Sequence, residues 1–244
     1  MSENTVLFYF LLFTISFLYA SVGHGGASGY LALMVFFSFT PETMKSSALL
    51  LNIIVSFIAF IQYYHAGHFK FKLFFPFAVT SIPAAFLGGL ISIDATIYKK
   101  ILAILLLFPV FRFILSEKEE NPKIVSQNIY LSLIMGTIIG LLSGMIGIGG
   151  GIILSPIILL LHWANMKQTA AVSALFIFVN SIAGFIGMLT KDTIILPEIY
   201  IFVMIAVAGG IVGSYLGAKK FNSTVLKFIL ASVLVIASIK LMTT

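Results

Sequence analysis

Charge and cysteine are what this 244-residue sequence has least of. Charged residues make up 9% of the chain, hydrophobic residues make up 60%, and cysteine does not occur. Without cysteine the chain can form neither a disulfide nor a thiolate metal site. Its mean hydropathy of +1.14 comes from repeated long apolar runs, which no soluble core needs. The sequence therefore predicts a protein that crosses a membrane several times.

Acidic residues are missing from the middle of every apolar run. All eight lie at run ends or in polar segments: Glu3, Glu42, Asp94, Glu117, Glu119, Glu120, Asp192 and Glu198. Cation sites and proton relays in membranes usually place Asp or Glu inside the helix bundle. This distribution argues against a carboxylate-based cation transporter. It favours a site of neutral donors and backbone N–H groups, which suits an anion.

The few charges of the chain also indicate which partners to expect. The first residues carry an acid and no base, so we expect the first apolar run to remain as a span and not to be a signal peptide. The net charge of +6 comes mostly from bases at run ends, where anionic lipid headgroups account for them. We therefore expect membrane lipids as partners, no nucleic acid, no cofactor and no metal. A homo-oligomer is left open.

The apolar runs divide the chain into two halves. They cover 6–22, 29–39, 47–64, 73–93, 97–115, 129–146, 152–163, 168–189, 196–217 and 224–242. Five runs precede and five follow a charged stretch that contains proline, which is a natural boundary. We predict a first transmembrane repeat over 1–116, a linker over 117–127 and a second transmembrane repeat over 128–244.

Matching short stretches in the same order indicate that the halves are a duplication. The matches pair Gly23–Gly26 with Gly147–Gly150, Met44-Lys45 with Met166-Lys167, and Pro83–Gly88 with Ala208–Gly213. The predicted fold is all-α, a polytopic membrane bundle of 8–10 helical segments in two pseudo-symmetric repeats with glycine-broken helices. If every run crosses the membrane, the halves are inverted; if the short runs are re-entrant, the halves are parallel. We favour the inverted arrangement.

A glycine-rich break follows the first run of each half. Each glycine costs a helix interior about 1 kcal/mol relative to alanine, so neither cluster can continue the helix. In lipid such a break persists only where it is buried in protein or lines a cavity. The free N–H groups of a glycine turn that opens a helix suit an anion. Paired breaks in corresponding places indicate a transport site.

The candidate substrate-binding residues lie in these breaks and on the runs that follow them. They are Gly23, His24, Gly25, Gly26, Ser28, Asn52, Gly147, Gly149, Gly150, Gly151, Ser155 and Asn180. His24 is either an anion partner or proton-sensitive gate, or a neutral histidine bonded to a carbonyl. Asn52 and Asn180 either face a pathway, Asn180 within a stripe that includes Ser173, Gly184 and Gly187, or join helices.

The layout resembles the sulfite exporter TauE/SafE family of membrane permeases. The resemblance rests on the paired halves and on the stretch Gly147-Ile-Gly-Gly-Gly151 followed by Pro156. The first copy differs, with His24 and Ser28 as added features and Ala27 in place of the last glycine. The resemblance implies a permease for sulfite, an organosulfonate or a related sulfur oxyanion in a prokaryotic cytoplasmic membrane.

Two other functions compete with that of a secondary transporter. A channel-like facilitator for small anions or neutral solutes is the alternative that the same residues allow. An intramembrane enzyme would need an acid/base pair or a metal cluster. His24 alone within the spans, with neither carboxylate nor cysteine, does not supply one, so we expect no catalytic residues.

Overall fold

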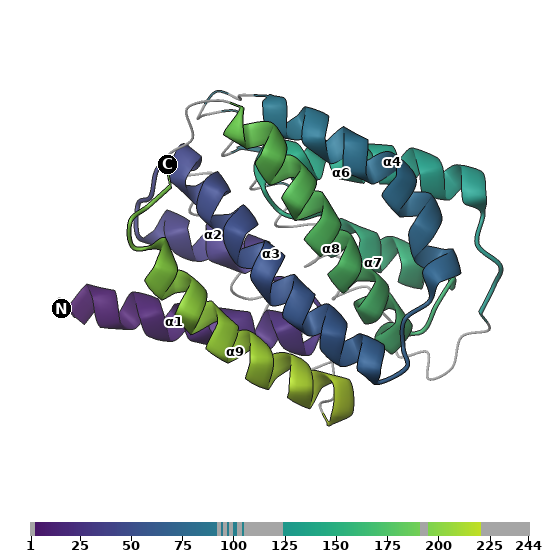
Figure 1. Cartoon of the computed structure of the whole chain (residues 1–244), viewed down its shortest axis with the longest axis horizontal. Helices are drawn as coiled ribbons and strands as arrows, with labels where there is room; N and C mark the ends of the chain where they lie inside the picture. The colour runs from purple at the N-terminus through teal and green to yellow at the C-terminus, as the bar shows by residue number, and fades with distance from the viewer. Residues whose placement is uncertain are drawn as a thin grey trace.

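The chain folds into a bundle of helices. The structure is a computed structural model that describes residues 3–91, 94, 97, 100–101, 104, 124–190 and 195–220. Within these residues it contains eight α-helices and no strand (Figure 1). They are α1 (Glu3–Ser21), α2 (Ala27–Phe36), α3 (Pro41–His65), α4 (Phe71–Leu90), α6 (Ile129–Ile146), α7 (Gly151–Leu160), α8 (Met166–Leu189) and α9 (Ile199–Lys219).

The helical class predicted from the sequence is therefore confirmed for the described part of the chain. Five helices, α3, α4, α6, α8 and α9, are long and apolar enough to cross a membrane. The runs expected over 97–115 and 224–242, and most of the expected linker, fall largely or wholly outside the described residues. The domain boundaries consequently stay a prediction.

The directions of the helices follow from which ends meet. Tyr63, near the end of α3, donates a hydrogen bond to the carbonyl of Ser21 at the end of α1 (2.8 Å). Tyr63 also packs with Ala170 near the start of α8 and with Ala218 near the end of α9. We call this end of the bundle the Tyr63 end and the opposite end the Lys45 end, after Lys45 in the first turns of α3. Thus α1, α3 and α9 run toward the Tyr63 end, and α8 runs away from it.

Two ladders of glycine hold the outer helices together. On α9 three glycines spaced by four contact three α1 backbone positions: Gly209 on Phe13, Gly213 on Phe17 and Gly217 on Ser21. On α6 three glycines with the same spacing contact α4: Gly136 on Phe77, Gly140 on Ser81 and Gly144 on Ala85. Small residues at this spacing let helix backbones approach closely in lipid. Both pairs are parallel, because the residue numbers rise together.

Each ladder joins a helix of one half to a helix of the other. Helix α4 begins soon after α3 ends and so runs away from the Tyr63 end, as its parallel partner α6 does. Each helix of the second half therefore runs opposite to the helix in the same place of the first half: α6 to α1, α8 to α3 and α9 to α4. Helix lengths also agree, at 19, 10, 25 and 20 residues before the boundary and 18, 10, 24 and 21 after it. These features support inverted repeats, which remain a prediction.

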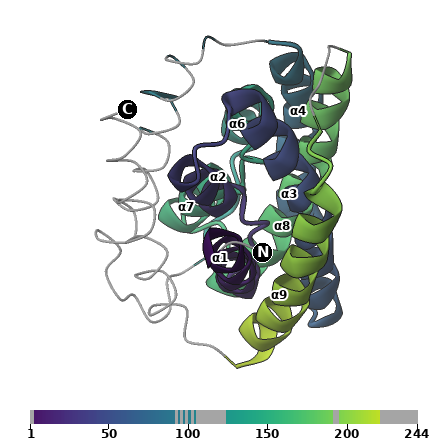
Figure 2. The ribbon, with the colours of Figure 1, turned by 90° about the vertical axis from the view of Figure 1, so that its left-hand side faces the viewer.

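The short helices α2 and α7 approach one another from opposite ends of the bundle. At ten residues each they are about 15 Å long, half the hydrocarbon layer. They lie in different halves of the long axis in Figure 1 but overlap in the perpendicular view of Figure 2. Ala27 at the start of α2 contacts Asn52 at the middle of α3, whereas Phe37 just after α2 packs on Phe8 near the start of α1. Hence α2 begins near mid-depth and ends at the Lys45 end.

Charged side chains separate between the two ends. Five lysines lie at the Tyr63 end: Lys70, Lys72, Lys167, Lys219 and Lys220. The acids Glu42, Asp94 and Glu198 lie at or beyond the opposite ends of their helices, with Lys45. The positive-inside rule predicts that the Tyr63 end faces the cytoplasm.

Candidate functional site

The first glycine loop turns the chain back from α1 into α2. Gly23 and Gly26 have φ of +74° and +100°, a region that side-chain-bearing residues adopt only at a cost. Gly26 is the N-cap of α2. Space also demands glycine here, because a Cβ at Gly23 would lie 2.5 Å from the Cβ of Ala170 on α8. The loop is therefore pressed against a helix of the second half.

The second glycine loop makes the same turn between α6 and α7. Gly147, Gly149 and Gly150 have φ of +89°, +70° and +79°, and Gly150 is the N-cap of α7. A Cβ at Gly147 would lie 3.2 Å from the Cγ of Lys45 on α3, so this loop is pressed against a helix of the first half. Gly151, the first residue of α7, lies against Ile177 of α8.

Asn52 lies between the two loops at the middle of α3. Its side chain is fully buried, and its Oδ1 accepts a hydrogen bond from the N–H of Ala27 at 3.0 Å. That bond also fixes the amide orientation, because only the oxygen can accept from an N–H. Gly25 packs against the same Oδ1, and a Cβ at Gly149 would lie 2.6 Å from Nδ2. Asn52 thus caps α2 with its acceptor and turns its donor toward the other loop.

Polar groups without partners collect beside Asn52. Its Nδ2 is buried with no hydrogen-bond partner, and so is the Oγ of Ser181 on α8. Both lie against Gly149, where a Cβ would be 2.9 Å from that Oγ. A buried donor left unpaired costs about 1–3 kcal/mol. Two such donors beside the first turns of two short helices, whose N–H groups have no acceptor within the helix, form a site suited to an acceptor-rich ligand.

His24 and Ser155, predicted separately, are brought together. The Oγ of Ser155 on α7 is 3.0 Å from the Nε2 of His24 and 2.7 Å from the Oγ of Ser173 on α8. The Nδ1 of His24 is 3.0 Å from the carbonyl oxygen of Val22. A chain of hydrogen bonds therefore joins the first loop to two helices of the second half.

Two predicted residues are engaged elsewhere. Ser28 donates to the hydroxyl of Tyr19 on α1 at 2.8 Å, so it ties α2 to α1. Asn180 donates from Nδ2 to the carbonyl of Phe176 in its own helix at 2.8 Å, although its buried Oδ1 has no hydrogen-bond partner. Gly184, which the sequence placed on the Asn180 stripe, packs on Gly144 of α6. These residues do not join the Asn52 cluster.

Ser181 and Ile177 belong to the site but were not predicted from the sequence. A Cβ at Gly25 or at Gly149 would meet the Cγ2 of Ile177 at 3.1 or 2.7 Å, so Ile177 fills the space between the loops. A signal was present, since Ser173, Ile177 and Ser181 follow one another every four residues along one face of α8. The neighbouring Asn180 is the more polar side chain, which is why the sequence pattern favours it over Ser181.

The described residues contain no cluster of metal ligands. Among residues 3–91, 124–190 and 195–220 and the few described between them, no group of three His, Asp or Glu side chains stands close enough to hold one. The site consists of backbone N–H groups, an amide, hydroxyls and one histidine.

A bundle of helices long and apolar enough to span a membrane, with two short helices packed among them, fits a multi-pass membrane transporter. A family model described as Sulfite exporter TauE/SafE matches residues 8–241. The chain belongs to this family, as its sequence motifs indicated.

Relatives across bacteria and archaea carry the same general description. The chain is 34% identical over 235 residues to probable membrane transporter protein y4hK of Sinorhizobium fredii, covering 94% of this chain and 95% of the relative. It is 24% identical over 240 residues to probable membrane transporter protein YdhB of Bacillus subtilis, covering 93% and 94%. With probable membrane transporter protein MJ0441 of Methanocaldococcus jannaschii it shares 26% over 159 residues, covering 63% and 59%. No solved structure matches the chain.

Proposed function

We propose that this membrane transporter carries a small sulfur-containing oxyanion, such as sulfite or an organosulfonate, and binds it where the two glycine loops meet. The observation that carries the proposal is the fully buried amide of Asn52, whose Nδ2 has no partner. The site would replace the water around an anion with backbone N–H groups of both loops, the Asn52 amide and the Ser181 hydroxyl. The family description supports the substrate class.

The composition of the site favours an anion over a cation. Of the two groups that point into it without partners, Asn52 Nδ2 can only donate and the Ser181 hydroxyl can donate as well as accept. Both short helices begin there, so the positive ends of their dipoles converge on it. A cation would need carboxylate or carbonyl oxygens instead. Oxyanions offer several acceptor oxygens, which matches donors arriving from two loops and two long helices.

The broken crossings also suggest how access alternates. Each glycine loop is pressed against a long helix of the other half, at Ala170 for Gly23 and at Lys45 for Gly147. If one half rocks against the other, one of these contacts would open while the other stays closed. The anion would then meet only one side of the membrane at a time, which distinguishes a transporter from an open pore.

Flux measurements in proteoliposomes test the substrate class. Sulfite, thiosulfate, methanesulfonate and sulfate would be offered to the purified protein, with uptake and counterflow measured for each. We expect saturable flux and counterflow for at least one of the first three. Flux that never saturates and shows no counterflow would replace the transporter with a channel, and no flux of any sulfur oxyanion would overturn the substrate class.

The variant Asn52→Asp tests the site. Asp keeps an oxygen that accepts from the Ala27 N–H, so α2 stays capped, but it replaces the unpaired donor with an acceptor or a negative charge. We expect at least a tenfold fall in anion flux. Asn128→Asp is the matched control, because Asn128 also caps a helix through its side-chain oxygen, at the exposed start of α6. Equal flux in the two folded variants would contradict the assignment.

A further inference from the structure

We propose that Ile177 is the specificity-determining residue of the anion site. It forms an apolar wall beside the hydrogen-bond donors, so the site selects sulfur oxyanions that have three oxygens and one side that accepts no strong hydrogen bond. This inference deepens the proposed function and rests on it. It starts from the position of Ile177 on α8, where the side chain is 2% exposed.

The side chain of Ile177 contacts both glycine loops. A Cβ at Gly25 of the first loop would lie 3.1 Å from its Cγ2, and a Cβ at Gly149 of the second loop would lie 2.7 Å from the same methyl group. Gly151, the first residue of α7, packs against its Cδ1. Ile177 therefore lies where the two loops of the proposed site meet.

The donors of the site lie next to this methyl group. Three atoms lie within 2.9 Å of the point that a Cβ of Gly149 would occupy: Asn52 Nδ2, Ser181 Oγ and Ile177 Cγ2. A ligand oxygen that accepts from Asn52 and Ser181 is therefore a near neighbour of Ile177. The site thus has a polar side, formed by these two groups and the N–H groups of the loops, and an apolar side.

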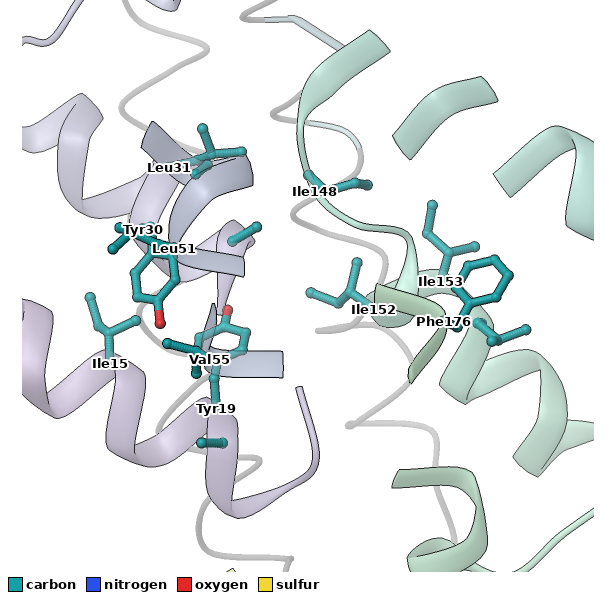
Figure 3. Close-up of a cluster of buried hydrophobic side chains, with 14 of the residues drawn as sticks. Ile15, Tyr19, Tyr30, Leu31, Leu51, Val55, Ile148, Ile152, Ile153 and Phe176 are labelled. Carbon is teal, nitrogen blue, oxygen red and sulfur yellow. The ribbon is translucent and has the colours of Figure 1, made fainter. Parts of the chain in front are cut away.

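The residues that flank these contacts are apolar as well. Ile148 precedes Gly149, Ile152 follows Gly151, and both are buried. Figure 3 shows Ile148 and Ile152 in one cluster with Phe176, the residue before Ile177. Isoleucine is branched at Cβ and strongly prefers a single χ1 rotamer in a helix. Ile177 therefore cannot easily turn away from the loops, and its position limits what can approach the donors.

This arrangement distinguishes anions by the number of their oxygens. A sulfonate can direct three oxygens to the donors and its carbon substituent to the wall. Thiosulfate can direct its terminal sulfur there, because sulfur accepts hydrogen bonds only weakly. Sulfate has a fourth oxygen in that place. Ile177 offers this oxygen no hydrogen bond, and a buried acceptor that has lost its hydrogen bonds to water weakens binding.

Competition for methanesulfonate uptake into proteoliposomes tests the wall. Thiosulfate and sulfate are the charge-matched competitors, because both are dianions and they differ in one terminal atom. For the wild type we expect sulfate to need at least about tenfold the concentration of thiosulfate for the same inhibition, which is the loss that one unpaired buried group produces. This ratio does not depend on the fraction of protein that is active.

Ile177→Asn and Ile177→Leu form a matched pair of variants. Asparagine and leucine have nearly the same shape, but only asparagine carries N–H donors. Ile177→Asn should lower the ratio of the sulfate to the thiosulfate concentration at least about fivefold, because the fourth oxygen of sulfate gains a donor. Ile177→Leu should keep the wild-type ratio. Equal ratios in the two variants would overturn the role of the wall.

A further variant introduces no polar group into the core. In Ile177→Ala the space beside the donors grows, so propanesulfonate should compete at a concentration at least about tenfold lower than in the wild type, since one methylene in a close-fitting pocket changes binding about 10- to 200-fold. Ile158→Ala is the control for a general loosening, because Ile158 is a buried isoleucine near the end of α7, and it should compete as the wild type does. Unchanged competition in Ile177→Ala would contradict the inference.

Failure of this inference is separable from failure of the proposed function. Wild-type methanesulfonate uptake that sulfate and thiosulfate inhibit equally would overturn the selection by Ile177 and leave the anion transporter intact. Sulfite flux without methanesulfonate flux would do the same, because the wall is expected to accept a methyl group. The absence of flux for every sulfur oxyanion would instead contradict the proposed function.

Discussion

Replacing Gly149 with alanine tests whether the two glycine loops are as tightly packed around Asn52 as the structure indicates. The new methyl group would lie 2.6 Å from Asn52 Nδ2 and 2.7 Å from Ile177 Cγ2, closer than carbon atoms tolerate. The backbone has φ of +70° there. We expect about 1–2 kcal/mol from the left-handed conformation and about 1–3 kcal/mol more from overpacking.

Gly67 offers a matched control. It has nearly the same φ, +77°, in the loop between α3 and α4, yet a Cβ there would meet nothing within 4 Å. Gly67→Ala therefore carries the backbone cost without the packing cost. For a chain of about this size 1 kcal/mol corresponds to roughly 2–4 °C. Gly149→Ala should accordingly melt about 2–12 °C below Gly67→Ala.

The assay is thermal unfolding of the detergent-purified variants, followed by loss of the monodisperse peak in size-exclusion chromatography. A double-mutant cycle sharpens the test, because Ile177→Ala removes one of the three atoms that lie within 3.0 Å of the new methyl group. Gly149→Ala should then cost less in the Ile177→Ala background than in wild type. Equal melting temperatures for Gly149→Ala and Gly67→Ala would refute the packing argument.

Two further expectations follow from the ends of the bundle. Because the chain has no cysteine, a single introduced cysteine reports on which side of the membrane it lies. Lys70→Cys should react with a membrane-impermeant thiol reagent only from the cytoplasm, and Ser38→Cys only from outside. The reverse pattern would contradict the orientation. Partial burial, together with the charge of Lys167, lowers the pKa of His68, so Lys167→Gln should raise it in NMR titrations. Since the folded state disfavours protonated His68, its contribution to stability falls as the pH drops below the ordinary histidine value. An unchanged pKa in Lys167→Gln would show that the charge of Lys167 does not act on His68.

The roles of the glycines could be predicted from the sequence, because a helix break or a close helix contact depends on the local spacing of residues. Three or four glycines within a long apolar run cannot continue a helix, and ladders such as Gly209, Gly213 and Gly217 show their spacing directly. Both classes of glycine stand at helix breaks or helix contacts in the structure. The helical class, the short helices and the family were all within reach of such patterns.

The residues that contact the loops could not be predicted from the sequence, because they come from distant segments of the chain. Asn52 and Gly149 are brought together by the crossing of two halves, and no periodicity within either half encodes that meeting. The same holds for Ser155, which finds His24 across 131 residues. Polarity favours Asn180, but Ser181 is the residue that faces the second loop. The two cannot both face it, because neighbouring residues on a helix point about 100° apart.

The contacts between the two halves explain why the site is asymmetric even if the halves are the inverted repeats that we predict. Each glycine loop is completed by the other half: the first by Ala170, Ser155 and Ser173, the second by Lys45. A substitution in one half can therefore change the surroundings of the loop that belongs to the other half. Leu31 and Ile148 keep one side apolar while Ser155 and His24 make the other side polar. The two sides of the site can therefore differ in polarity although the helices around them correspond.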